Sequence, residues 1–274
     1  MLEYLTPPNL KDNARITVTC WSKLRSRILS LLIFNLSLLT SQCGLDIEDS
    51  TPPSPPVWVQ KSLPEEWPER GIDASELGGI FLDWELNKDE NIAAYLIYRA
   101  EYFDESDSLS DFNSISHIKV EGISESVYLD VEVLVGKAYC YKLKAEDVSG
   151  NMSTYGEPLK YRLLPAIYLS SLRPNGRDDK LYADKILSWY YNYNVEMENY
   201  CLTVLSFENE LIFRRTFSPV NYVSGYESYH IPDSVVLNSN QRYRWRIDTA
   251  AQYVDGTETA GSESPWATFL YISG

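Results

Sequence analysis

A cysteine at the end of an apolar stretch is the residue of this chain with the clearest chemistry. Residues 28–39 are apolar and follow a basic segment, residues 23–27, and Cys43 stands where the chain turns acidic and rich in proline. Positive charge, a short apolar run, small polar residues and a change of composition are typical of an export signal. We therefore predict that residues 1–42 are removed and that acyl chains on Cys43 hold the rest of the chain on a membrane.

The apolar run is shorter than the roughly 20 residues that a membrane-spanning helix needs, so we expect no permanent span. Leu39, Thr40 and Ser41 resemble the residues that precede the cysteine in bacterial lipoprotein signals. Gln42 departs from that pattern because it is larger than the residue usually found there, and ordinary cleavage nearby is the alternative. Gly44 resembles lipoproteins that are passed on to the outer membrane. The predicted location is the bacterial cell envelope, at the outer rather than the inner membrane.

No spacing of residues in the chain predicts a catalytic site. The two histidines, His117 and His230, have no cysteine or carboxylate at the spacing of a zinc site. The sequence has no Gly-x-Ser-x-Gly turn and no glycine-rich phosphate loop after a strand. Carboxylates in residues 101–111 and 147–151 are of the kind that bind calcium, but their spacing fits no EF-hand and turns favour Asp and Asn for backbone reasons. We predict no enzymatic activity, no metal and no cofactor.

The chain is strongly acidic, with 39 acidic and 24 basic residues and a net charge of −15. Such a surface repels nucleic-acid phosphates, so we expect no nucleic-acid partner. It also repels an anionic bilayer, so membrane contact is expected through the lipid on Cys43 rather than through a basic face. We favour solubility of an exported protein, rather than an acidic ligand site, as the reason for the charge.

The elements expected after the signal are a tether and many short strands. Residues 43–56 are acidic and rich in proline without a hydrophobic period, which indicates a semi-rigid tether. From Val57 onward, short runs alternate apolar and polar residues between turn residues, so each strand has one buried and one wet face. Such runs without helical periods predict an all-β sandwich. The strands expected first are residues 79–84, 94–100, 116–120, 127–130 and 138–145.

Three features of residues 57–164 carry a family pattern. Trp84 ends the second expected strand, residues 95–99 read Tyr-Leu-Ile-Tyr-Arg, and Tyr139 begins an aromatic strand that is followed by the turn at 146–153. In these features the segment resembles a fibronectin type III domain. The resemblance implies that Trp84 and Tyr139 are core residues and that the Tyr139 hydroxyl bonds back to the loop near Leu134 and Gly136. It implies nothing about function.

A second sandwich is expected over residues 165–274, because the pattern repeats after about 105 residues, from Trp84 to Trp189 and from Tyr139 to Tyr243. This half resembles a fibronectin or an immunoglobulin-like sandwich equally well, and its expected core includes Trp189 and Trp245. Its strands are expected at residues 165–179 (a strand and a turn), 186–189, 200–205, 211–217 and 241–248. The chain is therefore predicted to contain two tandem β-sandwiches.

Two cysteines follow the lipidation site, Cys140 and Cys201, one in each sandwich and each on the outward register of its strand. Two cysteines are too few for a disulfide framework, although an oxidising compartment would allow one bridge.

Three tryptophans have no expected core position: Trp58, Trp67 and Trp266. Exposed rings beside carboxylates can form a sugar platform or anchor a protein interface, so these are the possible ligand-contact residues. The alternative is that they seal the ends of the sandwiches or the junction between them. Two functions follow from the sequence. One is a membrane-anchored protein-binding or spacer module of the envelope, and the other is a carbohydrate-binding accessory protein of the cell surface.

Overall fold

The structure is a computed structural model, and the chain divides into two compact units, residues 1–49 and 50–274. The described residues all belong to the second unit and are 50–62, 68–89, 91–120, 126–192, 197–220, 224–254 and 257–274. The predicted export signal, Cys43 and Gly44 lie outside the described residues. Within the described ranges, no helix is both long and apolar enough to cross a membrane.

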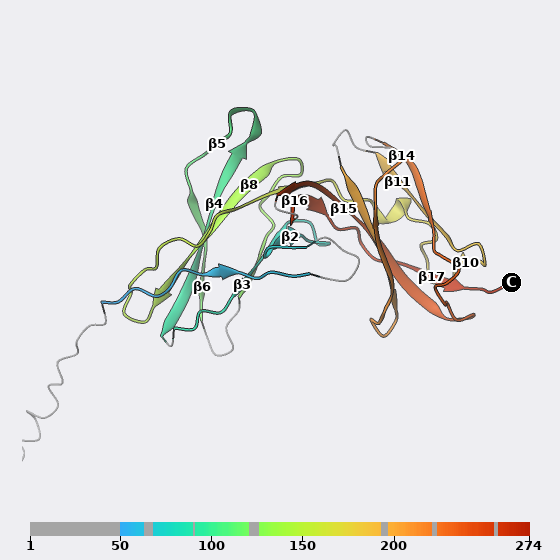
Figure 1. The fold of residues 1–274 in the computed structure, drawn as a ribbon, viewed down its shortest axis with the longest axis horizontal. Helices are drawn as coiled ribbons and strands as arrows, with labels where there is room; N and C mark the ends of the chain where they lie inside the picture. Colours follow the sequence, from blue (N-terminus) through green and yellow to red (C-terminus); the bar gives the residue numbers. More distant parts are fainter. Residues whose placement is uncertain are drawn as a thin grey trace, which may run out of the picture. The chain divides into compact units, whose positions relative to one another are not determined.

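The first sandwich has two antiparallel sheets (Figure 1). In one sheet β3 pairs with β1, β2 and β7, and in the other β4 pairs with β5, β6 and β8, while β8 also pairs with β9. A short 3-10 turn, η1 (Asp104–Ser106), links β4 to β5. The strands are β1 (Val57–Trp58), β2 (Ile72–Ala74), β3 (Ile80–Glu85), β4 (Ile92–Phe103), β5 (Ser108–Leu109), β6 (Asn113–Lys119), β7 (Val127–Asp130), β8 (Ala138–Asp147) and β9 (Leu159–Leu163).

The second sandwich repeats this plan. β11 pairs with β14, β12 pairs with β13 and β15, and β15 pairs with β17. In place of a long first strand, an isolated bridge joins Arg173 to Ser188. The elements are η2 (Leu169–Ser171), β10 (Lys180–Leu181), β11 (Ile186–Asn192), β12 (Asn199–Ser206), β13 (Leu211–Phe217), β14 (Ser224–His230), β15 (Arg242–Val254), β16 (Thr257–Ser262) and β17 (Ala267–Tyr271).

Alternation of side chains builds one hydrophobic core in each sandwich. The first core contains Trp84 and Tyr139, and the second contains Trp189 and Trp245, with all four residues buried. Burying a large apolar side chain contributes about 1.5–3 kcal/mol, so these rings are a main source of stability. The prediction of an all-β chain that contains two β-sandwiches is confirmed.

Each sandwich also holds a tyrosine whose hydroxyl accepts a backbone hydrogen bond from five residues upstream. The N–H of Leu134 donates to the Tyr139 hydroxyl at 3.0 Å, as the family resemblance implied. The N–H of Asn238 donates in the same way to Tyr243 at 2.8 Å. The two halves therefore share a local device as well as a strand plan.

One pairing was not expected from the sequence. β16 pairs in parallel with β9, with Ala260 opposite Arg162 and Gly261 opposite Leu163. The N–H of Leu164 adds a bond of 2.7 Å to the carbonyl of Gly261. One sheet of the first sandwich is thus continuous with one sheet of the second, because β9 is bonded to β8 on one side and to β16 on the other.

Cys140 and Cys201 lie on the outward register of their strands, as predicted, because their neighbours at alternate positions form the two cores. Both cysteines are nevertheless buried, and they are not joined by a disulfide. Their strand faces are covered at these points: Cys140 lies between Ala100 and Lys160 on the flanking strands, and Cys201 packs against Ala250.

Residues 50–56, predicted as part of the tether, are held against the first sandwich. Pro53 and Pro56 are buried. The N–H of Ser54 donates to Asp89 at 3.1 Å, and its carbonyl accepts from the Asn87 amide at 2.6 Å. Because of these bonds and the burial of two proline rings, residues 50–56 lie against the first sandwich and do not act as a spacer.

Candidate functional site

A groove with an apolar lining lies where the two sandwiches join. It has a volume of about 470 Å³. Its floor is built from Leu163, Leu164 and Ile167, which are buried in the segment that leaves β9. Its rim carries apolar side chains that water reaches, namely Leu77, Val135, Tyr168 and Leu169. Exposed apolar side chains around a hollow are typical of a site that binds a protein or a small apolar ligand.

A tight turn between β2 and β3 presents Leu77 at the rim. The N–H of Gly78 donates to the carbonyl of Ser75 at 2.9 Å, and the N–H of Ser75 donates to that of Gly79 at 3.1 Å. Gly78 has a φ of 77°, which only glycine adopts without strain. A Cβ on Gly79 would come within 2.6 Å of the carbonyl oxygen of Asp130. The turn is therefore fixed, and Leu77 at its tip is 78% exposed.

The opposite wall is the loop between β7 and β8, which carries Val135. Tyr139 holds this loop through the N–H of Leu134, and the N–H of Gly136 donates to the carbonyl of Leu163 at 2.8 Å. The Tyr139 side chain, predicted as a core residue that bonds back to this loop, thus also sets the position of a groove wall. Tyr168 closes the rim at the start of η2 and is 67% exposed.

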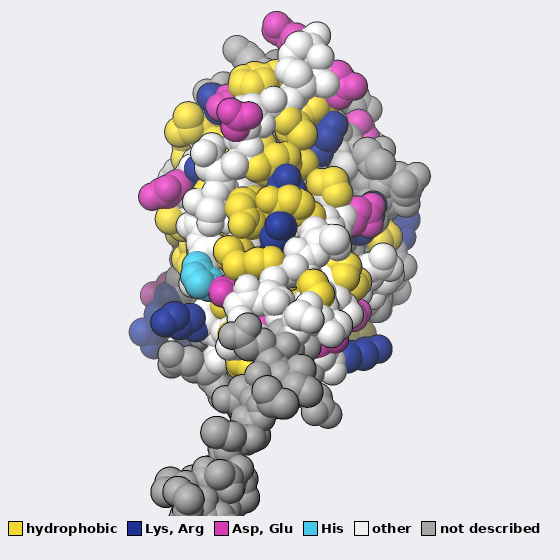
Figure 2. Space-filling view, turned by 90° about the vertical axis from the view of Figure 1, so that its left-hand side faces the viewer, with side chains coloured by type: hydrophobic (Ala, Val, Ile, Leu, Met, Phe, Trp, Pro, Cys, Tyr) yellow, Lys and Arg dark blue, Asp and Glu magenta, His cyan; other side chains and the backbone are white. Residues whose placement is uncertain are grey.

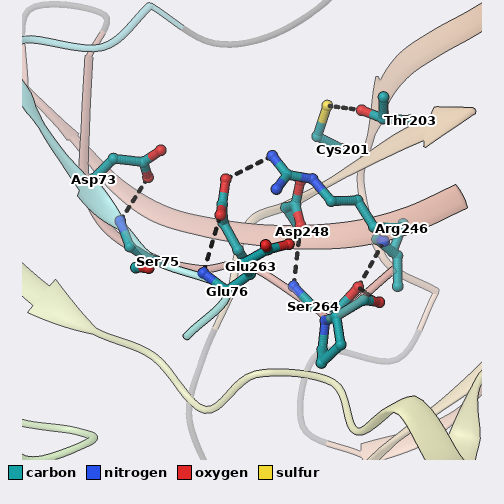
Figure 3. A network of polar contacts seen from close by, with 12 residues as sticks. Asp73, Ser75, Glu76, Cys201, Thr203, Arg246, Asp248, Glu263 and Ser264 are labelled. Carbon is teal, nitrogen blue, oxygen red and sulfur yellow. Dashed lines mark hydrogen bonds and ion pairs between the residues drawn. The ribbon is translucent and has the colours of Figure 1, made fainter. Parts of the chain in front are cut away.

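A polar network runs beside the groove and ties the two sandwiches together (Figure 3). Oε1 of Glu263 lies 2.5 Å from the Arg246 guanidinium, while Oε2 accepts the N–H of Glu76 at 3.1 Å. Arg246 also lies 2.9 Å from Asp248, and Asp248 accepts the N–H of Ser264 at 3.1 Å. A side chain of the second sandwich therefore bonds the turn that presents Leu77.

Electrostatics at this network follow from its burial. Loss of water raises the pKa of Glu263 to about 7; Arg246 opposes that rise, and the nearby Asp73 adds to it. Arg246 is shared with Asp248, so it compensates Glu263 only in part. Burial alone would lower the pKa of Arg246, but the carboxylates of Asp248 and Glu263 more than offset this, and the pKa is raised. The Arg246 guanidinium is therefore a permanent cation, and Glu263 titrates near neutral pH.

The network fits a structural clamp better than a catalytic centre. Ser264, its one hydroxyl beside a carboxylate, is fully buried, and its Oγ accepts the N–H of Ile247 at 3.0 Å. Among the described residues, no group of three or more His, Cys, Asp or Glu side chains could hold a metal ion. A perturbed carboxyl beside a hollow can mark function. Here its partners are the backbone and Arg246, so its evident role is to join the sandwiches.

The structure separates the three possible ligand-contact tryptophans. Trp58 is buried in the first core, and its indole N–H donates to the carbonyl of Glu157 at 2.6 Å, so it is not a ligand platform. Trp266 is partly buried, and its ring packs 4.5 Å from the Arg244 guanidinium and 5.0 Å from that of Arg246. Trp67 lies outside the described residues. Trp58 and Trp266 therefore seal the fold and do not gather on one exposed face.

The acidic segments considered for calcium also have internal roles. In the 101–111 loop, Glu101 pairs with Lys137 and Asp104 pairs with Arg162. At the 147–151 turn, the Asp147 carboxylate accepts the N–H groups of Ser149 and Asn151 at 2.9 and 2.8 Å. These carboxylates stabilise their own turns.

Comparisons with known proteins add little to this picture. No protein-family model and no curated protein matches the chain. Among solved structures, the chain is similar to the FN1–FN3 domains of chicken CNTN1, with 13% identity, a TM-score of 0.28, and coverage of 81% of this chain and 68% of that chain. It is also similar to the chicken interferon gamma receptor alpha chain, with 14% identity, a TM-score of 0.28, and coverage of 80% of this chain and 98% of that chain. Likeness at this level carries no argument, and the description of the fold rests on the strand pairing given above.

Proposed function

We propose that this chain is a non-catalytic module of the bacterial cell envelope that is tethered to a membrane through Cys43 and binds another envelope protein in the groove between its sandwiches. The single observation that carries the proposal is the fixed apolar rim, in which Leu77, Val135 and Tyr168 stand exposed on backbone that is bonded in place. A rim of this kind costs little entropy to order on binding, because its turns are already set.

The clamp between the sandwiches supports the same function. The β9–β16 pairing and the bond from Glu76 to Glu263 hold the two walls of the groove at a fixed separation. A spacer also needs a rigid contact between the two sandwiches. The same contacts would therefore suit a protein that binds a partner and a protein that acts as a spacer. The expected partner contributes an apolar segment, because most residues that line the groove are Leu, Val, Ala, Ile, Tyr or Pro.

The binding claim is tested by a photo-crosslinking side chain placed at position 77 or 168 in the native host. We expect both positions to yield one and the same crosslinked protein, and we expect position 236 to yield none. Val236 is a suitable control because it is 76% exposed but does not line the groove. The captured protein, once purified, should bind the purified chain, and Leu77→Asp should weaken that binding at least tenfold while Val236→Asp leaves it unchanged. Equal crosslinking from all three positions would contradict the proposal.

The tether is tested separately by the intact mass of the protein from the membrane fraction. We expect a chain that starts at Cys43 and carries acyl chains, and we expect Cys43→Ser to be released or left unprocessed. A soluble chain without acyl groups would remove the membrane from the proposal and leave the groove experiment unaffected.

A further inference from the structure

A second surface lies on the outward face of the first sandwich, away from the groove. Strand β8 turns Tyr141 and Leu143 into the core and Lys142 and Lys144 outward. Alternate residues of a strand lie about 6.6 Å apart on the same face. The side of the molecule that carries this sandwich shows apolar side chains gathered around cationic ones (Figure 2).

Aromatic rings hold these lysines in place. The Lys142 ammonium lies 3.6 Å from the ring centre of Phe112 and 3.8 Å from that of Tyr155. The Lys144 ammonium lies 4.4 Å from the Tyr155 ring, which also meets Tyr98 edge-on at 5.3 Å. Contacts between a cation and a ring orient the ammonium group without neutralising its charge. We call these five residues the lysine–aromatic face.

The charge of this face stands out against the rest of the chain. With 39 acidic residues, the molecule has many carboxylates that could pair with surface lysines. Yet in the part of the chain that the structure describes, neither Lys142 nor Lys144 forms an ion pair. The adjacent carboxylate of Glu146 is paired with His117 at 2.9 Å. Charges more than about 8 Å away are largely screened at physiological salt, so most of the net negative charge of the chain acts only weakly on a ligand held at these two lysines.

The sheet pairing restricts what can bind there. β8 is bonded to β4 on one side at Lys142 and Lys144, and β4 is bonded to β6 beyond it. On the other side the pairing with β9 ends at Tyr141, and the next segment covers the edge: the N–H of Gly156 donates to the carbonyl of Leu143 at 3.0 Å, and that of Ser153 donates to the carbonyl of Ala145 at 2.9 Å. An extended acidic peptide therefore finds no open edge of β8 beside the two lysines for main-chain hydrogen bonds. A polymer of sugar rings needs no such edge, because its rings lie flat on aromatic side chains and its acidic groups bond to ammonium groups.

We propose that the lysine–aromatic face binds an anionic polysaccharide, with its carboxylate or sulfate groups on Lys142 and Lys144 and a sugar ring against Tyr155. Tyr155 is 41% exposed, so part of its ring remains open beside the lysines. This site is independent of the groove and would attach the module to a charged glycan while the groove holds a protein.

The test measures binding of polygalacturonate and of dextran sulfate to the purified protein by calorimetry, with neutral dextran as the uncharged probe. We expect at least one anionic polymer to bind and dextran not to bind. The double variant Lys142→Gln/Lys144→Gln should weaken the binding at least tenfold. The matched control Lys88→Gln/Lys180→Gln removes the same charge from two exposed lysines elsewhere and should leave the binding unchanged. The variant Lys142→Arg/Lys144→Arg keeps the positive charges and the ring contacts and should retain binding. It shows whether the weaker binding of the glutamine variant comes from the lost charge rather than from misfolding.

Three results would overturn the proposal. The first is that neither anionic polymer binds. The second is that the control variant loses as much affinity as the double glutamine variant, which would assign binding to overall charge. The third is that polyglutamate binds as tightly as the polysaccharides with the same dependence on Lys142 and Lys144, which would assign the face to acidic polypeptides. None of these results bears on the groove, whose partner is tested at Leu77.

Discussion

The two sandwiches share one strand plan but fill their interiors differently. In the first, the carboxylate of Asp130 is buried and lies 2.6 and 2.8 Å from the Arg99 guanidinium. The Tyr141 hydroxyl donates to the same carboxylate at 2.8 Å. Burial, with Asp130 adding to it, raises the pKa of Tyr141 well above its usual range. The first interior therefore depends on a matched set of polar partners.

The interior of the second sandwich contains a larger cluster of rings than the Trp84–Tyr95 pair of the first. The ring of Trp189 lies 5.1 Å from that of Tyr200, 6.1 Å from Phe217 and 6.4 Å from Trp245, measured between ring centres. Such pairs contribute about 0.5–1.5 kcal/mol each beyond the area they bury. The comparison teaches that one strand plan tolerates two kinds of interior, one specified by charge and one by volume. We therefore expect substitutions in the two interiors to lower the free energy of unfolding by different mechanisms.

The largest effect is expected from Trp189→Ala. It removes the ring at the centre of the second core and leaves a cavity, so we expect the free energy of unfolding to fall by about 3–5 kcal/mol. Differential scanning calorimetry should show the loss in the second sandwich. Trp84→Ala, in the first core, is the matched comparison and should destabilise the first sandwich instead. An unchanged melting temperature for Trp189→Ala would contradict an interior specified by volume.

Removing one polar partner should cost about 3 kcal/mol in the first sandwich. Asp130→Ala leaves the Arg99 guanidinium half-buried without its carboxylate, and breaking one side of a buried pair is strongly destabilising. Replacing both partners, as Arg99→Met/Asp130→Leu, should recover much of the loss, because no charge is then left behind. Urea unfolding measures both. A double variant as unstable as the sum of the two single variants would show that charge matching is not what specifies this interior.

The sequence predicted the parts of the molecule that depend on local alternation. Residues 127–130 and 211–217 form strands with the predicted bounds, and the Tyr139 hydroxyl bonds where the family resemblance placed it. The groove was not predicted, because its lining comes from segments far apart in the chain, which the β3–β7 and β9–β16 pairings bring together. Its strongest sequence signal was Leu77, an apolar residue beside Gly78 in a turn. The outward register of Lys142 and Lys144 indicated part of the lysine–aromatic face, but its rings come from β4 and from two separate loops.

The junction should respond to pH where the interiors do not. Glu263 has its pKa raised from the usual 4.5 to about 7 in the folded state, so the folded chain keeps a proton that the unfolded chain releases. The contribution of this group to stability is therefore fully present below pH 4.5 and is lost as the pH rises to about 7. We expect that loss to be on the order of 2 kcal/mol.

The measurement is the free energy of unfolding between pH 4.5 and 8 for the wild type and for Glu263→Gln. Other carboxylates titrate in the lower part of this window, so the informative quantity is the difference between the two proteins. We expect this difference to grow with pH in favour of the variant. The control Glu85→Gln changes an exposed carboxylate outside the junction. A difference that does not vary with pH would show that Glu263 is already ionised throughout this range.

The smallest effect is expected where the two sandwiches are most alike. Tyr139→Phe and Tyr243→Phe each remove the acceptor of one backbone N–H, at Leu134 and at Asn238, and each should cost about 1 kcal/mol. Hydrogen exchange at these two amides should quicken in the matching variant only. The consequences should then diverge, because the Leu134 loop carries Val135 at the groove and the Asn238 loop does not line it. If Tyr139→Phe weakens capture at position 77 and Tyr243→Phe does not, the same device supports folding in one sandwich and binding in the other.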